Sequence, residues 1–302
     1  MSRLDPVSLK LFITVVEKGT IAAAAEHEHL SAPAVSKRLI ELESFLQTEL
    51  LVRTNKGIEP TVAGLALLSL ARGVLHELDQ VQAQMESFTS GVRGLVRVCA
   101  SMSAITQFLA EPIQAFVSLH PNVQLQLEEK TSPFVVKAVA DNAADIGIFV
   151  PVVQLPDIQT FPFRTDQVVA ITPLKHPLAQ RNDVTLSELV DHDLVGLNAS
   201  SAIQTQLSRI AENTQRSLRV KIQVTSFDAL CMMVSAGLGV GLLPLRIAMR
   251  HRQTTPIHIT PISDAAANRT FLLAVRDKNA LSAAARFFLD HLLSSDPSNT
   301  QA

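Results

Sequence analysis

Helical periodicity with clear start and stop signals, near the beginning of the chain, limits the fold more than any other sequence feature. A first helix ends at Gly19, a short alanine-rich helix is predicted over residues 21–29, and a third over residues 32–46. Thr20 and Ser31 stand where the N-caps of the second and third helices belong. A helix, a tight turn and a capped helix predict a helix-turn-helix arrangement.

The start of the third helix has the chemistry of a helix that reads double-stranded DNA. Small side chains let the backbone approach the major groove, while hydroxyls, first-turn N–H groups and basic side chains bind phosphate. Residues 50–60 interrupt the helical pattern and predict a hairpin or wing. The residues expected at DNA are Ser31, Ala32, Pro33, Ala34, Ser36, Lys37 and Arg38 in the helix, with Arg53 and Lys56 in the wing. The alternative is an ordinary helical hairpin whose basic pair is simply solvated.

A long helix is predicted from Thr61, and it carries a heptad seam. Its apolar residues are spaced alternately by four and three, which is the a/d pattern of a coiled coil. The seam residues are Leu67, Ala71, Val74, Leu78, Val81, Met85 and Phe88. We expect residues 61–91 to pair two copies of the chain; the alternative is a helix that packs only on its own domain.

Beyond residue 94, short apolar runs alternate with helical stretches, which predicts βαβ units and a mainly parallel sheet. Strands are expected at 95–100, 123–129, 145–150, 167–172, 218–224, 240–243 and 271–275, and helices at 104–119, 134–140, 229–236 and 280–293. The pattern fits either one large sheet or two smaller lobes. The expected fold class of this region is therefore α/β.

Composition excludes several other classes of protein. With 47% hydrophobic and 18% charged residues the chain is globular, and no apolar run is long enough to span a membrane. The absence of Trp and Tyr argues against stacking platforms for single-stranded nucleic acid. The first residues do not have the pattern of a signal peptide, so we expect a cytoplasmic protein.

No catalytic, metal or cofactor site is expected. His27 and His29 are two residues apart, so they point to different sides of a helix. Cys99 and Cys231 fit no CxxC pattern and are expected to be small buried hydrophobes, not a redox pair. The glycines of residues 235–244 precede Leu-Leu-Pro and do not open a helix, so they are expected to pack a helix on a strand.

Residues 9–64 resemble the winged helix-turn-helix of LysR-type transcriptional regulators. The matching positions are Leu9, Phe12, Val15, Gly19, Thr20, Ala24-Ala25, Ser31, Pro33-Ala34-Val35-Ser36, Leu42-Glu43, Leu50, Arg53, Thr61 and Ala63-Gly64. Residues 120–129, 144–149 and 235–244 extend the resemblance over nearly the whole chain. It implies a regulator that binds double-stranded DNA and a small-molecule effector, assembled as a homodimer or homotetramer.

The resemblance also implies a winged domain over residues 1–60, a linker and dimerisation helix over 61–91, and an effector domain over 92–302. The effector domain would resemble a periplasmic binding protein, with lobe one at 92–163 and 268–302 and lobe two at 164–267. An organic anion would bind between the lobes, at strand ends and helix N-termini. The residues expected there are Ser101, Ser103, Thr131, Ser132, Phe149, Asn198, Ser200, Ser201, Thr225 and Phe227. Helix capping alone is the alternative explanation for the hydroxyls.

Two features depart from the family pattern. Glu28 stands where the family usually has leucine, and Ala32 stands where it usually has a glutamine that often faces DNA. Residues 1–90 hold eight Lys and Arg against eleven Asp and Glu, an unexpected balance for a DNA-binding region. We expect the basic residues named above to gather on one surface away from the acids. Non-specific DNA binding should then be weak, with a shallow salt dependence.

Two other classes of function remain alternatives. An enzyme on the α/β region would need a nucleophile elbow, a metal cluster or a dinucleotide fingerprint, and the sequence contains none where it is needed. A small-molecule-binding protein would need neither the helix-turn-helix motif nor the heptad seam. The intact motif over residues 20–64 favours the regulator.

Overall fold

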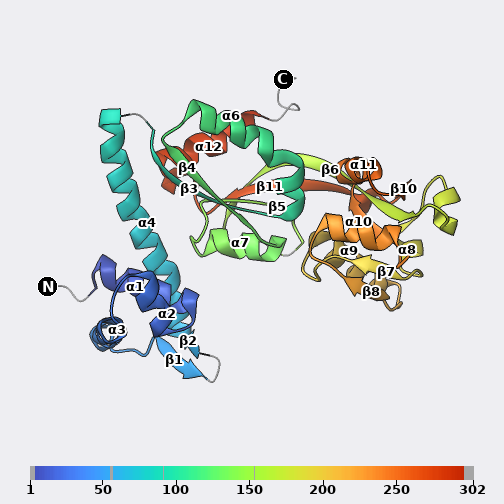
Figure 1. The fold of residues 1–302 in the computed structure, drawn as a ribbon. Coiled ribbons are helices and arrows are strands. Elements are labelled where there is room, and N and C mark those ends of the chain that lie inside the picture. Colours follow the sequence, from blue (N-terminus) through green and yellow to red (C-terminus); the bar gives the residue numbers. More distant parts are fainter. Residues whose placement is uncertain (1–3, 55–56, 91, 153, 296–302) are drawn as a thin grey trace. The chain divides into compact units, whose positions relative to one another are not determined.

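The computed structural model describes residues 4–54, 57–90, 92–152 and 154–295 (Figure 1). The chain divides into two compact units. The N-terminal unit comprises Met1–Arg93 and Asp141–Ala143, and the C-terminal unit comprises Gly94–Ala140 and Ala144–Ala302. Each unit has its own buried core, so each is described by itself.

The N-terminal unit is a helix-turn-helix followed by a hairpin and a long helix. Its elements are α1 (Pro6–Lys18), α2 (Ile21–His27), α3 (Ala32–Leu46), β1 (Leu51–Thr54), β2 (Gly57–Pro60) and α4 (Val62–Ser90), and β1 pairs antiparallel with β2. Phe12, Val15, Val35 and Leu42 are fully buried in its core. The predicted three helices and wing are therefore confirmed.

Local backbone chemistry explains the turns between these helices. Gly19 has a φ of +73° and ends α1, and the Thr20 hydroxyl oxygen accepts a hydrogen bond of 3.2 Å from the Ala23 N–H to cap α2. The end of α2 falls two residues before the predicted one, because His29 has a φ of 54°, which a continuing right-handed helix does not allow. Ser31 occupies the N-cap of α3, but its hydroxyl makes no capping hydrogen bond.

The C-terminal unit contains a sheet with the strand order β10-β6-β11-β5-β3-β4, and β9 also pairs with β6. Its first part contains β3 (Gly94–Ala100), α5 (Met102–Ala104), a π-helical turn η1 (Ile105–Leu109), α6 (Ala110–Leu119), β4 (Val123–Glu129), α7 (Ser132–Ala140) and β5 (Ile146–Phe149). The chain returns to this part through β11 (Asn268–Val275), a 3-10 turn η4 (Lys278–Ala280) and α12 (Ala283–Ser294). We call these elements lobe one.

The second part, which we call lobe two, is built around a separate cluster of buried residues between Val168 and Ala267. Its helices are α8 (Leu186–Leu189), α9 (Ala202–Asn213), α10 (Phe227–Ser235) and α11 (Leu245–Arg252), with 3-10 turns η2 (Pro177–Gln180) and η3 (Ala265–Ala267). Its strands are β7 (Leu194–Gly196), β8 (Val220–Gln223), β9 (Gly241–Pro244) and β10 (Ile257–Pro261). The sequence patterns did not predict β7, β10, α8 or α11, all of which are short.

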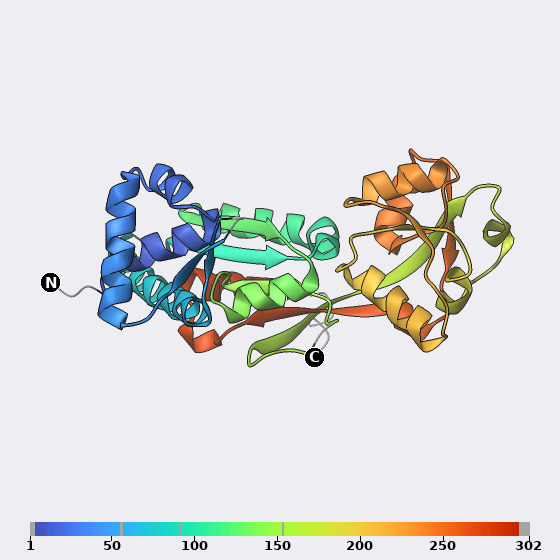
Figure 2. The ribbon, with the colours of Figure 1, turned by 90° about the horizontal axis from the view of Figure 1, so that it is seen from below.

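One strand runs through both parts of this unit. β6 (Gln159–Pro173) pairs through its first residues with β11 and through its last residues with β9 and β10 (Figure 2). The strands of lobe one and lobe two therefore form one hydrogen-bonded path, which both parts share through β6. The prediction of a mainly parallel sheet was wrong, because β6 and β11 run antiparallel to each other and to their other partners, and within this sheet only β4, β3 and β5 are mutually parallel. β7 and β8 pair in parallel apart from it.

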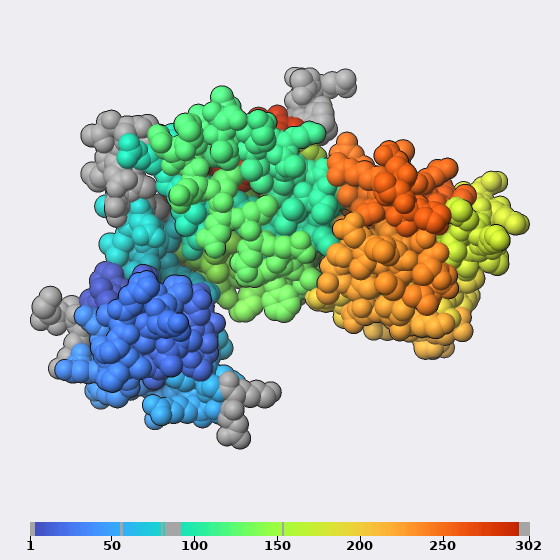
Figure 3. Space-filling model, viewed as in Figure 1, coloured from blue at the N-terminus to red at the C-terminus, as the bar shows by residue number. Residues whose placement is uncertain are grey.

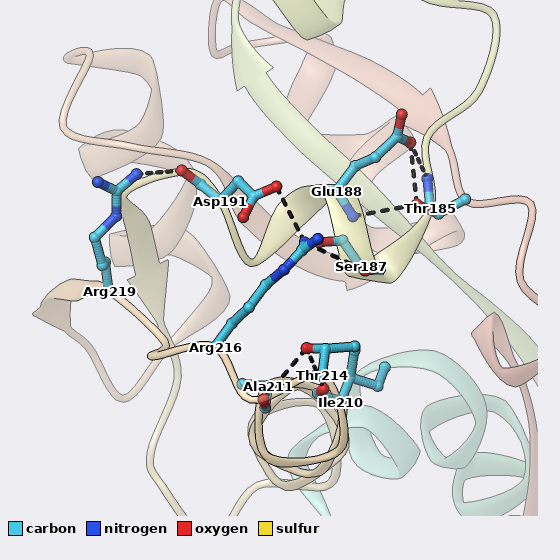
Figure 4. Close-up of polar contacts among 9 residues, drawn as sticks. All are labelled: Thr185, Ser187, Glu188, Asp191, Ile210, Ala211, Thr214, Arg216 and Arg219. Carbon is cyan, nitrogen blue, oxygen red and sulfur yellow. Dashed lines mark hydrogen bonds and ion pairs between the residues drawn. The ribbon is translucent and has the colours of Figure 1, made fainter.

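Polar contacts fix the loops of lobe two. Thr185 and Glu188 form a capping box at the start of α8, and Arg216, beyond the end of α9, donates to the Ser187 carbonyl at 3.0 Å and to Asp191 at 3.1 Å (Figure 4).

The space-filling view shows lobe one and lobe two in contact along their boundary (Figure 3). Within the part of the chain that the structure describes, no helix is long and apolar enough to cross a membrane.

Candidate DNA interface and effector site

In the N-terminal half of α3, some side chains are buried in the core and others are exposed. Val35 and Leu39 are buried against α1 and α2, whereas Ala32 and Ser36 are half-buried. The exposed residues on this part of the helix are Ser31, Pro33, Ala34, Lys37 and Arg38. Small side chains and two cations therefore lie on one accessible surface, which is what approach to a DNA groove needs.

An acidic residue contacts this basic surface. The Arg38 guanidinium lies 3.3 Å from the Asp5 carboxylate and donates to the Ser8 hydroxyl at 3.2 Å. Asp5 is also the N-cap of α1 and accepts from the Ser8 N–H at 3.0 Å. Burial opposes ionisation, but these hydrogen bonds and the charge of Arg38 together lower the pKa of Asp5. The expectation that the acids lie away from the basic residues was wrong for Asp5.

Glu28, one of the two departures from the family pattern, joins α1 to the end of α2. Its carboxylate lies 2.7 Å from the Lys10 ammonium and accepts from the Thr14 hydroxyl at 3.0 Å, and its side chain is 10% exposed. Burial opposes ionisation, yet hydrogen bonds from Lys10, Thr14 and His27 lower the pKa of Glu28. Glu28 therefore makes polar contacts at a position where an apolar side chain would otherwise pack.

The wing is held close to the turn between α1 and α2. The Ile58 N–H donates to the Gly19 carbonyl at 2.7 Å, and a Cβ on Gly57 would lie 2.6 Å from that carbonyl oxygen. Gly57 also has a φ of +127°, so only glycine fits without strain. Arg53 is exposed on β1, while Lys56 lies outside the described residues.

The heptad seam on α4 divides into two parts. Ala71 is buried, and Leu67 packs against the core of the N-terminal unit, so the packing alternative is correct for these two residues. Further along, Val74, Leu78 and Val81 are 48%, 46% and 58% exposed. The side chains of Met85 and Phe88 lie outside the described residues. A row of apolar residues therefore continues beyond the unit's own core.

In lobe one, the predicted effector residues stand at the carboxyl ends of three neighbouring parallel strands. Ser101 follows β3, Thr131 and Ser132 follow β4, and Phe149 ends β5. The hydroxyl oxygens of Ser101 and Ser132 are buried, with no hydrogen-bond partner among the described residues. Phe149 is fully buried in the core. Two buried hydroxyls without partners indicate a polar site, because such groups normally find partners.

One hydrogen bond joins this strand edge to lobe two. The Thr131 hydroxyl donates to the Ser200 hydroxyl at 3.0 Å, and Ser200 in turn donates to the Asn198 side-chain oxygen at 3.0 Å. The Ser201 hydroxyl caps α9, so the capping explanation accounts for its hydrogen bond. Of the remaining predicted residues, Ser103 is half-buried, Thr225 is exposed and Phe227 is buried.

The two cysteines are buried, as predicted, on a lobe-one strand and a lobe-two helix. Burial raises the pKa of Cys99 to about 11 and that of Cys231 to about 12, so both remain thiols at neutral pH. Among the described residues, no group of three or more His, Cys, Asp or Glu is placed to hold a metal ion.

Comparisons with known proteins agree with this architecture. The family model described as the bacterial regulatory helix-turn-helix protein, lysR family, matches residues 7–65, and the LysR substrate binding domain matches residues 89–296. The chain belongs to the LysR family of transcriptional regulators, whose C-terminal part is an effector-binding domain. The relatives found are transcriptional regulators and not enzymes, so the predicted family and class are confirmed.

Individual relatives are distant but cover most of the chain. The uncharacterized HTH-type transcriptional regulator YbhD of Escherichia coli is 28% identical over 93% of this chain and 89% of its own length. CysL of Bacillus subtilis is 27% identical over 84% of this chain and 86% of its own. Among solved structures, a full-length OxyR variant from Pseudomonas aeruginosa has a TM-score of 0.73 at 20% identity, covering 98% of this chain and 95% of that one. Full-length CbnR complexed with its target DNA has a TM-score of 0.65 at 20% identity, covering 97% and 100%.

Sequence patterns missed the polar partners of the interface. Asp5 and Ser8 contact Arg38 of the predicted interface, and Lys10 and Thr14 contact Glu28 at the end of α2. In each case the partner lies far away in the sequence. The Asp5 N-cap before Pro6 was readable as a helix start, but its contact with Arg38 depends on how α1 packs on α3.

Proposed function

We propose that α3 and the wing bind operator DNA and that a small organic anion, bound at the boundary between the lobes, controls that binding. The observation that supports the DNA part is the exposed surface of Ser31, Pro33, Ala34, Lys37 and Arg38 on α3. Half-buried Ala32 and Ser36, together with Arg53 and Lys56 of the wing, complete the proposed contacts. The protein would act in the cytoplasm, where its DNA is accessible.

Selection of bound genomic fragments, followed by footprinting, tests the DNA part. We expect an extended footprint of symmetric half-sites spaced by whole helical turns. Lys37→Ala should weaken binding to the selected fragment and reduce the salt slope by about 1, since one phosphate contact is lost. Lys175→Ala removes the same charge from an exposed turn of lobe two and serves as the control. Equal affinities of the two variants would reject the role of Lys37.

The effector part rests on Ser101 and Ser132, whose buried hydroxyls have no partner among the described residues. The first N–H groups of α7 begin beside Ser132, and hydroxyl and main-chain donors together suit a carboxylate. Thr131 and Ser200 hydrogen-bond across the lobe boundary, so a ligand here would contact both lobes. The proposed site further includes Ser103, Phe149, Asn198, Ser201, Thr225 and Phe227.

Calorimetric titration with aliphatic and aromatic carboxylates tests this site. Ser132→Ala should weaken the binding of any active compound by about tenfold or more, because a hydrogen bond to a charged group contributes about 1.5–3 kcal/mol. Ser118→Ala, which removes a more exposed hydroxyl on α6, should bind as the unchanged protein does. A compound that alters the footprint but binds Ser132→Ala unchanged would place the effector elsewhere.

We further propose that the chain assembles as a dimer through residues 61–91 and as a tetramer through additional contacts of the effector domains. The exposed apolar residues Val74, Leu78 and Val81 support the dimer. A two-fold dimer would match the symmetric half-sites expected in the operator.

A further inference from the structure

Two histidine side chains meet in lobe two, and neither belongs to the proposed effector site or to the DNA surface. His176 lies in the turn between β6 and η2, and His192 lies in the loop between α8 and β7. Their rings are edge-to-face with centroids 5.1 Å apart, and both side chains are half-buried. The contact therefore joins η2 to the loop from which β7 begins.

A hydrogen bond of η2 requires His176 to be neutral. Its Nδ1 lies 3.2 Å from the Leu178 nitrogen and accepts from that N–H, so the ring caps the first turn of η2. An imidazole nitrogen accepts a hydrogen bond only while it carries no proton. Burial and the nearby charge of His192 lower the pKa of His176, which favours the neutral ring. The cap is therefore present at neutral pH and is lost when Nδ1 takes up a proton.

A different contact holds the other end of η2. Arg181, directly after η2, donates to the Glu188 carboxylate of α8 at 3.2 Å. Hydrogen bonds from the N–H and the hydroxyl of Thr185 lower the pKa of Glu188. Because a carboxylate already titrates at lower pH than a histidine, Glu188 stays ionised while the histidines take up protons. Moderate acid therefore acts on the histidine end of η2 and leaves the Arg181 end in place.

The other charged groups around the pair are largely matched. The strands packed against η2 contribute His258 on β10 and no titratable side chain from Val168 to Pro173 of β6. The remaining groups are Asp191 with Arg216 (Figure 4), Asp193 with Arg219 and Lys221, and the exposed Lys175 and Asp183. Among the described residues, no ion pair joins either ring of the pair to a carboxylate. Protons on both rings would therefore repel each other without a counter-charge.

The loop that carries His192 leads directly to the lobe boundary. It continues into β7, which is buried throughout and is followed by Asn198 and Ser200. The backbone of β7 is held on both sides, since the Leu194 N–H donates to the Arg219 carbonyl and the Val195 N–H donates to the Val240 carbonyl, each at 2.9 Å. A displacement at the histidine end of this short strand is therefore passed to the hydroxyl of Ser200.

We propose that His176 and His192 form an acid-sensitive switch in lobe two. When both rings are protonated they repel, η2 loses its cap, and the loop before β7 separates from η2, which loosens the segment that carries Asn198 and Ser200. The unfolded chain takes up these protons at higher pH than the folded chain does. The stability of this region therefore falls as the pH falls below about 6.5.

Hydrogen exchange of the full chain at pH values of about 7.5 and 5.5, corrected for the direct effect of pH on chemical exchange, tests the proposal. We expect residues 174–181 and 194–201 to lose protection by about fivefold or more at the lower pH, as the loss of a capping bond predicts. His176→Asn should remove this loss, because the asparagine oxygen can accept the same N–H and takes up no proton. His258→Asn, which removes a histidine outside the pair, should respond to pH as the unchanged protein does.

Equal losses of protection in His176→Asn and the unchanged protein overturn the proposal. So does a loss over residues 174–181 that leaves residues 194–201 unchanged. His192→Gln keeps the cap but removes the second charge, so its loss should be smaller than that of the unchanged protein, and an equal loss contradicts the repulsion.

The consequence for effector binding rests on the function proposed above. A carboxylate that binds at the lobe boundary should bind more weakly at the lower pH to the unchanged protein than to His176→Asn. Expected exchange behaviour without binding of any carboxylate at either pH would support the switch and count against the proposed effector site.

Discussion

Single residues explain how an N-terminal unit with excess acid still presents a basic surface. Glu28 is neutralised by Lys10 and takes a hydrogen bond from Thr14, and Glu17 pairs with Arg72 at 2.7 Å. These acids therefore stabilise contacts between helices, and their charges are balanced within the unit. Asp5 differs from them, because its partner Arg38 belongs to the surface proposed to meet DNA.

Asp5→Asn should strengthen DNA binding. Asparagine keeps the N-cap of α1 while removing the charge that competes with phosphate for Arg38. An exposed ion pair contributes about 0.2–1 kcal/mol, so we expect a gain of up to about fivefold in affinity and a steeper salt dependence. Fluorescence anisotropy with labelled operator at two salt concentrations measures both quantities.

The double variant Asp5→Asn with Arg38→Ala is the control for this effect. If Asp5 acts through Arg38, the asparagine gives no gain once the arginine is absent. Unchanged affinity in the single variant would show that the Asp5–Arg38 contact does not limit DNA binding.

At the scale of elements, the caps of α2 and α3 have separate roles. Thr20 makes its capping hydrogen bond, while the Ser31 hydroxyl makes none and is exposed at the start of the proposed recognition helix. Sequence pattern predicted both cap positions correctly. Whether each hydroxyl caps its helix depends on rotamers and neighbours that the pattern does not describe.

This difference predicts opposite outcomes for two similar substitutions. Thr20→Ala should lower the free energy of unfolding of the N-terminal unit by about 1 kcal/mol, since a capping bond is lost. Ser31→Ala should leave that stability nearly unchanged and weaken operator binding instead. Two measurements on both variants distinguish these roles. Calorimetry gives the free energy of unfolding, and fluorescence anisotropy with labelled operator gives the affinity for DNA. Equal destabilisation by both substitutions would contradict the assignment.

At the scale of the whole molecule, α4 carries a row of exposed apolar residues, Val74, Leu78 and Val81. Leu78→Glu should weaken the dimer, because a coiled-coil seam would have to bury the new charge. Asp79→Ala, on the same helix but outside the seam, should leave assembly unchanged. Analytical ultracentrifugation over a range of concentrations measures the result. Identical assembly of Leu78→Glu and the unchanged protein would remove α4 from the interface.

The sequence by itself determined the elements whose signals are local. Helical periodicity, Gly19 and the cap residues predicted the helix-turn-helix, and alternating apolar runs predicted most of the strands. The predicted sheet direction failed at β6 and β11, since strand pairing depends on partners about a hundred residues away. For the same reason only the tertiary structure placed Asp5 on Arg38, joined Thr131 to Ser200 and set Arg246 beside the Phe108 ring. These contacts arise when distant segments pack together, and no local pattern in the chain encodes which side chains then meet.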